Sequence, residues 1–101
     1  MQYAIYAMPG RRREGYVVNV QADLLTEIWT RVVIPLVPAS DAPRNLLGTL
    51  NPVLAVLGKP HVLLTQNLAS VPTPELGPPI GSLVSDRDAI VRAIDTLLSG
   101  I

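Results

Sequence analysis

Proline and glycine set the strongest limit on what this chain can fold into. Ten prolines and seven glycines occur among only 101 residues, and they interrupt the sequence at short intervals. Proline lacks an amide hydrogen and glycine weakens regular elements, so such a chain favours short strands joined by turns. The sequence therefore predicts a small antiparallel sheet or a partly open barrel, in one domain that spans residues 1–101.

Apolar residues alternate with period two in several runs that are typical of strands. Gln2 to Ala7 and Tyr16 to Gln21 are rich in β-branched and aromatic residues, and a glycine-flanked segment with three arginines joins them. We expect these two runs to form a hairpin with an arginine-tipped loop. Further strands are predicted at Thr30 to Leu36, with Pro35 near its end, at Pro52 to Leu57 and at His61 to Thr65.

Two segments between these runs and the C-terminal part are predicted to be irregular. Asp41 to Leu50 has room for one helical turn, which Pro43 and Gly48 keep short. The proline-rich stretch from Val71 to Gly81 is predicted to be a loop that leads into the final element.

The C-terminal residues follow a helical period instead. Ser85 to Asp88 resembles an N-cap followed by acidic residues in the first turn, where the helix dipole favours them. From Ala89 onward apolar residues recur at helical spacing, and Gly100 is placed to end the helix in a left-handed conformation. The fold class expected is thus mostly β with a C-terminal α-helix.

Composition excludes several classes of protein. Eight basic residues balance eight acidic ones, which argues against direct nucleic-acid binding, and the absence of cysteine excludes disulfide scaffolds and cysteine-based metal sites. No stretch suits a membrane span and the first residues lack the basic start of a signal peptide, so a cytoplasmic protein is expected. Apolar residues make up 49% of the chain, more than so small a domain can bury, which favours self-association.

Few residues suggest chemistry. His61 is the only histidine and is interpreted as a surface or hydrogen-bonded side chain, and no metal or cofactor site is predicted. Trp29, the only tryptophan, is expected to anchor the core or a dimer interface. Asp95 lies near the negative end of the predicted helix dipole, which weakly indicates that it faces a partner.

A set of short motifs spread over the whole chain carries a resemblance. These motifs are Met1-Gln2, Tyr6, Val20-Gln21, Asp23, Val33-Ile34-Pro35-Leu36, Pro52-Val53, Leu68-Ala69-Ser70-Val71-Pro72 and Gly100-Ile101. Together they resemble CcdB, the toxin of the CcdA–CcdB type II toxin–antitoxin module. The resemblance implies an SH3-like barrel of antiparallel strands with a C-terminal helix, a homodimer, and no enzymatic activity. It also implies binding to the DNA gyrase A subunit, which traps the cleavage complex, and neutralisation by a CcdA-like antitoxin.

The resemblance also implies two sets of binding residues. Those expected to contact gyrase are Leu24, Leu25, Asp95, Leu98, Ser99, Gly100 and Ile101. In this set Ser99 stands where the family has a tryptophan, Leu98 replaces a phenylalanine and Asp95 replaces an asparagine. Those expected to contact the antitoxin are Met8, Arg11, Arg12, Arg13, Glu14, Asp41, Arg44 and Leu46. The arginines suit an acidic, disordered partner that folds on binding.

Two other functions stay open. The same barrel serves the MazF and Kid endoribonucleases, although a neutral chain with a single histidine offers little for RNA cleavage. The second alternative is a non-toxic homologue that only binds antitoxin, which Ser99 makes plausible.

Overall fold

A computed structural model describes residues 1–10 and 15–100 of the chain. Seven strands occur in this part: β1 (Ala4–Ala7), β2 (Tyr16–Asn19), β3 (Thr30–Pro38), β4 (Val53–Val56), β5 (Lys59–Leu63), β6 (Ala69–Pro72) and β7 (Gly81–Ser82). Short 3₁₀ turns connect several of them, and the single helix α1 (Arg87–Ser99) follows the last strand. The mostly β fold with a C-terminal helix is therefore confirmed.

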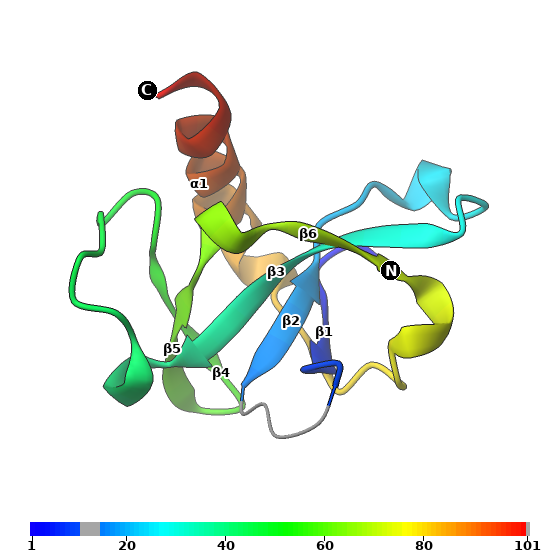
Figure 1. The fold of residues 1–101 in the computed structure, drawn as a ribbon, viewed down its shortest axis with the longest axis horizontal. Coiled ribbons are helices and arrows are strands. Elements are labelled where there is room, and N and C mark those ends of the chain that lie inside the picture. The colour runs from blue at the N-terminus through cyan, green and yellow to red at the C-terminus, as the bar shows by residue number, and fades with distance from the viewer. Residues whose placement is uncertain (11–14, 101) are drawn as a thin grey trace.

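The strands form one curled antiparallel sheet in the order β4-β5-β3-β2-β1-β7 (Figure 1). β1 and β2 pair as the predicted hairpin, with Ile5 opposite Val18. β3 is the longest strand and lies at the centre, where its residues 33–36 pair with β2 while its other edge is shared by two partners. Its first half pairs with β6 and its second half with β5, so the sheet bends over where the partner changes.

Pro35 does not end its strand as predicted but lies inside β3. Val20 donates its N–H to the Val32 carbonyl at 2.9 Å, and alternation along the ladder makes Val17 and Pro35 a non-hydrogen-bonded pair. The nitrogen of Pro35 therefore faces the other edge, between the end of β6 pairing at Val33 and the start of β5 pairing at Leu36. No ladder donor is needed at that gap, which is why a central strand tolerates this proline.

The core lies between the concave face of the sheet and helix α1. Strand residues such as Val18, Ile34 and Leu36 are fully buried there, and the helix contributes Ile90 and Ala93, whose side chains are also fully buried. The helical spacing of these two residues brings them to the same face, as the apolar pattern predicted. The buried stripe fixes α1 against the sheet and leaves its opposite face exposed.

The two ends of α1 are formed differently. Gly100 has a left-handed conformation with φ of 74° and donates its N–H to the Thr96 carbonyl at 2.9 Å, so the predicted C-terminal cap is confirmed. At the start, the capping position is Asp86, which makes no side-chain hydrogen bond to the helix. The expected cap at Ser85 is wrong because a 3₁₀ turn, Val84–Asp86, leads directly into the helix.

The two segments predicted to be irregular contain short regular pieces. The stretch from Val71 to Gly81 is not entirely loop, since β6 extends to Pro72 and β7 begins at Gly81. In the segment from 41 to 50 a 3₁₀ turn ends at Asp41, and a single helix-like turn closes at the far end, where Asn51 donates its N–H to the Leu47 carbonyl at 2.6 Å. The buried side chain of Asn51 also holds this segment. That amide accepts the Leu47 N–H at 3.2 Å and donates to the Leu63 carbonyl at 2.9 Å, so a side chain organises this loop.

Candidate functional site

The last turn of α1 extends away from the sheet (Figure 1). Leu98 is 78% exposed there, and Asp95, Ser99 and Gly100 are exposed around it. The Ser99 hydroxyl donates to the Asp95 carbonyl at 2.6 Å, and Gly100 closes the helix. The predicted residue Ile101 lies outside the described residues. The helix end therefore presents an apolar side chain on a well-capped turn, a form suited to contact with another protein.

The predicted pair Leu24 and Leu25 lies in the 3₁₀ turn Asp23–Leu25, far from the helix end. Figure 1 shows this turn and the C-terminal turn of α1 on opposite sides of the molecule. Leu24 is 86% exposed and Leu25 is also exposed. One copy of the chain thus does not bring the two parts of the predicted gyrase surface together.

Residues 24–29 form an ordered arm with an apolar surface. The Arg31 guanidinium donates to three carbonyl oxygens in or next to the arm, those of Thr26, Ile28 and Thr30. Thr73 adds two hydrogen bonds to the Trp29 carbonyl, from its N–H at 2.9 Å and its hydroxyl at 2.6 Å. Trp29 is 67% exposed, so its expected place in the core is wrong, while a place in an interface stays a prediction.

One pocket is lined by residues that border the two predicted antitoxin segments. Met8 is partly buried, Asp41 and Arg44 are exposed, Leu46 is partly buried, and Arg11, Arg12, Arg13 and Glu14 lie outside the described residues. Gly15, directly after the first segment, and Ser40, directly before the second, both line this pocket. The fold therefore joins the edges of two segments that are separated by 26 residues or more in the sequence.

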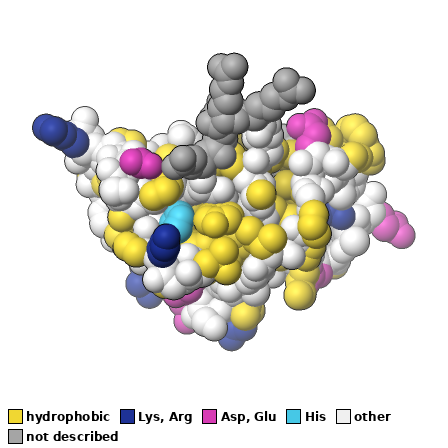
Figure 2. Space-filling view, turned by 90° about the horizontal axis from the view of Figure 1, so that it is seen from below, with side chains coloured by type: hydrophobic (Ala, Val, Ile, Leu, Met, Phe, Trp, Pro, Cys, Tyr) yellow, Lys and Arg dark blue, Asp and Glu magenta, His cyan; other side chains and the backbone are white. Residues whose placement is uncertain are grey.

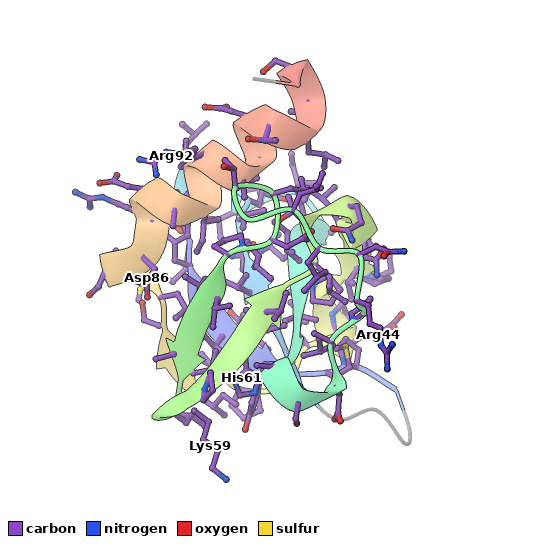
Figure 3. The ribbon with its side chains drawn as sticks, turned by 90° about the vertical axis from the view of Figure 1, so that its left-hand side faces the viewer. Arg44, Lys59, His61, Asp86 and Arg92 are labelled. Atoms are coloured by element: carbon purple, nitrogen blue, oxygen red, sulfur yellow. The ribbon has the colours of Figure 1, made fainter. Side chains whose placement is uncertain are left out.

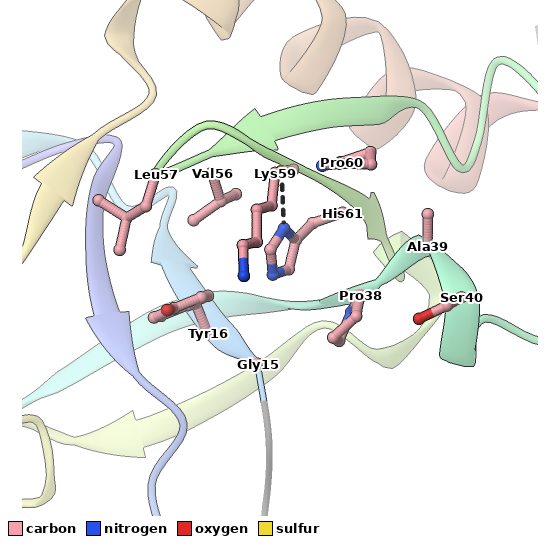
Figure 4. A pocket seen from close by; sticks show the side chains of 10 residues that line it. All are labelled: Gly15, Tyr16, Pro38, Ala39, Ser40, Val56, Leu57, Lys59, Pro60 and His61. Carbon is pink, nitrogen blue, oxygen red and sulfur yellow. Dashed lines mark hydrogen bonds between the residues drawn. The ribbon is translucent and has the colours of Figure 1, made fainter.

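This pocket, here called the His61 pocket, has a volume of about 770 Å³. Its lining comes from β2, β3, the following 3₁₀ turn and the β4–β5 hairpin (Figure 4). The lining residues are Gly15, Tyr16, Pro38, Ala39, Ser40, Val56, Leu57, Lys59, Pro60 and His61. Figure 2 shows this face, with the histidine beside a basic side chain and a continuous apolar patch. Figure 3 shows Lys59 and His61 at the end of the hairpin opposite to α1.

His61 is the buried polar group of the pocket. Its side chain is only 5% exposed, its ring Nδ1 lies 2.9 Å from the Lys59 carbonyl oxygen, and its ring centroid is 5.4 Å from that of Tyr16. The prediction of a hydrogen-bonded histidine is confirmed, whereas a surface position is wrong. Because a carbonyl oxygen only accepts, Nδ1 is the donor, and the other ring nitrogen, Nε2, has no partner among residues 1–10 and 15–100.

The comparison with protein families decides the identity. The family model described as CcdB protein matches residues 2–100, nearly the whole chain. The chain belongs to the CcdB family. The resemblance read from the scattered motifs is thereby confirmed, and this CcdB-family chain is a toxin of a toxin–antitoxin system with an antitoxin as partner.

A solved structure with the same fold is the Mycobacterium tuberculosis toxin MazF-mt6. It superposes with a TM-score of 0.72 at 20% sequence identity, over 92% of this CcdB-family chain and 93% of the other. At that identity the likeness speaks for the fold, and it confirms the predicted MazF-like barrel.

Other features of the CcdB-family chain bear on its chemistry. Among residues 1–10 and 15–100, no three histidine, aspartate or glutamate side chains gather where they could hold a metal ion. In the same residues no helix has the length and apolar character that a bilayer crossing requires. The described lining of the His61 pocket contains no carboxylate that could orient the histidine as in a catalytic triad.

Sequence reasoning missed the pocket and the apolar arm. Lys59, Tyr16 and His61 come from two strands that are not neighbours in the sequence, and no local pattern predicts their approach. The sequence held a weak signal that Trp29 is exposed, because the preceding residues Asp23, Thr26 and Glu27 are polar, as is typical of an exposed segment.

Proposed function

We propose that this CcdB-family toxin binds the A subunit of DNA gyrase and traps the covalent cleavage complex. The observation that carries the proposal is the exposed C-terminal turn of α1, where Leu98 is 78% exposed on a helix closed by Gly100. Burying such a leucine in a partner stabilises a complex by about 1–2 kcal/mol. The family's target is cytoplasmic, and we place the toxin there.

The position of Leu24 and Leu25 supports a homodimer as the active form. Within one chain the 3₁₀ turn that carries these residues lies across the molecule from the C-terminal turn of α1, whereas a second copy related by two-fold symmetry can place its helix end beside them. The exposed apolar residues Trp29 and Ile28 on the same arm add area for such a contact. In this proposal the antitoxin acts elsewhere, at the segments around Met8 to Glu14 and Asp41 to Leu46.

A cleavage assay tests the proposal directly. Purified toxin is incubated with supercoiled DNA, ATP and the gyrase of the source organism, followed by detergent and protease. We expect linear DNA that depends on both toxin and gyrase, because trapped complexes release double-strand breaks. If no linear DNA forms with the cognate gyrase, the proposal is wrong and a homologue that only binds antitoxin becomes the better description.

Ser99 is the position at which affinity for gyrase is open to improvement. A buried aromatic anchor contributes roughly 2–4 kcal/mol at an interface hot spot, and serine lacks this contact. The Ser99 side chain is exposed, so a tryptophan there disturbs only the hydrogen bond to Asp95. We expect Ser99→Trp to tighten binding to a gyrase A fragment about tenfold or more, whereas Asp88→Trp, exposed in the first turn of the same helix, leaves it unchanged. Equal affinities of Ser99→Trp and the unaltered toxin contradict this role of the helix end.

The endoribonuclease alternative has its own observation, the likeness in fold to a MazF toxin together with a histidine and a lysine at one pocket. Incubation of the purified toxin with long RNA distinguishes it from gyrase poisoning. We expect the RNA to stay intact. Cleavage that is lost in Lys59→Gln favours the ribonuclease.

A further inference from the structure

We propose that the His61 pocket binds an acidic side chain of the antitoxin, with its carboxylate on the Lys59 ammonium, a backbone N–H of the same segment on His61 Nε2, and a neighbouring apolar side chain against Leu57. The assignment of this peptide to the antitoxin rests on the toxin–antitoxin function given above. The pocket chemistry itself does not depend on gyrase. The argument uses the polar end of the pocket, its apolar side and its position in the fold.

The polar end of the pocket consists of the Lys59 ammonium and the His61 ring. The His61 side chain is only 5% exposed, and its Nδ1 donates a hydrogen bond to the Lys59 carbonyl oxygen. Among the described residues no buried side-chain nitrogen or oxygen lacks a partner, so the unpaired Nε2 must have access to the pocket. In Figure 4 the His61 ring and the Lys59 ammonium point the same way, toward the space between Tyr16 and Pro38.

No acidic residue occurs among the described residues that line the pocket. A lysine ammonium beside an imidazole, with no carboxylate to neutralise it, complements a single negative charge brought by a ligand. The hydrogen bond from Nδ1 to a carbonyl fixes the ring orientation, so Nε2 is held as an acceptor for a backbone N–H of the bound peptide.

The apolar side of the pocket includes a residue in a strained backbone conformation. Leu57 has φ of 51° and Gly58 has φ of 80°, which makes them the two central residues of the tight β4–β5 turn. Asparagine or glycine normally occupies the first position of such a turn, because a left-handed leucine is sterically costly. Leu57 is 61% exposed, so burial in the toxin alone does not explain its selection. A leucine at this strained position is explained by an apolar contact with a ligand.

The position of the pocket indicates which partner fills it. Its rim includes Gly15 and Ser40, which border the two segments expected to contact the antitoxin. We therefore place the acidic residue of an antitoxin peptide at this rim, between Gly15 and Ser40. A nucleic acid is less suited, since it needs several cations for its phosphates and Lys59 is the only lysine or arginine in the described lining.

The test uses two short peptides as probes of the whole toxin chain. Acetyl-Leu-Glu-Leu-amide and acetyl-Leu-Gln-Leu-amide differ only in the charge of one side chain, and each is titrated into isotope-labelled toxin by NMR. We expect the glutamate peptide to shift the signals of Tyr16, Lys59 and His61 and to bind about tenfold more tightly than the glutamine peptide. Equal binding of both peptides, or shifts confined to other parts of the toxin, overturns the proposal.

Variants of the exposed Lys59 make the test independent of folding, because changes at the buried His61 can unfold the sheet. We expect Lys59→Gln to lose most of the preference for the glutamate peptide, whereas Arg87→Gln, which removes the same charge at the start of α1, keeps it. In Lys59→Glu the preference should reverse toward acetyl-Leu-Lys-Leu-amide. A Lys59→Gln variant that keeps the full preference overturns the proposal.

Two further outcomes separate this proposal from its alternatives. Tighter binding of the dinucleotide UpA than of the glutamate peptide at the same signals overturns the proposal in favour of RNA. A negative gyrase cleavage assay leaves the peptide titration unaffected, because no gyrase takes part in it. Failure of the gyrase function and failure of the peptide site are therefore distinguishable.

Discussion

Gly15 joins the hairpin loop to β2 at a point where a side chain has no space. Its φ is 103°, and a Cβ atom built on its backbone would lie 2.4 Å from the Leu36 carbonyl oxygen. Leu36 belongs to the central strand β3 and pairs with Tyr16 on one edge and Leu63 on the other, so its carbonyl cannot turn away. Gly15→Ala must therefore either open the sheet or distort the turn beside the His61 pocket.

Two physical effects set the size of the loss in Gly15→Ala. A non-glycine residue at positive φ costs about 1–2 kcal/mol. Forcing extra atoms into a packed site costs about 1–3 kcal/mol more. We expect a loss of about 3 kcal/mol in the free energy of unfolding, which in a domain of this size lowers Tm by roughly 12–24 °C.

Two other glycines serve as matched controls for thermal and urea unfolding followed by circular dichroism. Gly10 has φ of 94° with no atom within 4 Å of a built Cβ, so Gly10→Ala carries the backbone cost alone, about 1–2 kcal/mol. Gly48 has neither a positive φ nor a near neighbour, so Gly48→Ala should be neutral or stabilise by up to about 1 kcal/mol. If Gly15→Ala costs no more than Gly10→Ala, the steric argument is refuted.

Three further substitutions test other parts of the structure. Asn51→Ala should lower the free energy of unfolding by about 2–3 kcal/mol, because the buried Leu63 carbonyl loses its donor. If urea titration gives a free energy of unfolding within about 0.5 kcal/mol of that of the unaltered protein, which is on the order of experimental error, the result argues against this bond. Ile90→Ala should cost about 3 kcal/mol in the same assay and Val91→Ala less than about 1 kcal/mol, since Ile90 is fully buried and Val91 is 44% exposed; equal losses contradict the assigned helix face. Leu57→Asn should raise stability by about 0.5–1 kcal/mol through relief of backbone strain while it weakens binding of acetyl-Leu-Glu-Leu-amide, and a destabilised variant speaks against stored strain.

Local patterns were sufficient for the parts of the fold that rest on local interactions. The β1–β2 hairpin has its two strands adjacent in the sequence, and the period of its apolar residues shows which of them are strand-like. Helix α1 carries its own signals, an apolar stripe ending in Ile94 and Leu98 and a glycine at position 100 that adopts the expected left-handed conformation. The motif set from Met1 to Ile101 likewise identified the family, because such a set is a property of the sequence itself.

Strand β6 shows why other elements could not be predicted locally. Ala69 to Pro72 contains a proline and a serine and has no strong strand pattern. It becomes a strand because the first half of β3 offers an open edge, with Thr30 opposite Pro72 across 42 residues of sequence. The same edge explains why Pro35 fits inside β3, since its missing N–H faces the gap between two partners.

The sequence alone thus determined three things. These are the high share of apolar residues, the family, and the residue types at the C-terminal end of α1. Only the tertiary structure decided where exposed apolar residues lie, with Leu24 and Trp29 on one arm and the last turn of α1, which carries Leu98, on the far side of the molecule. It also decided that His61 is buried beside Lys59 in a pocket. The physical reason is that the exposure of a side chain and the lining of a pocket depend on which strands pair. In this sheet the central strand β3 pairs with β5 and β6, which are distant from it in the sequence.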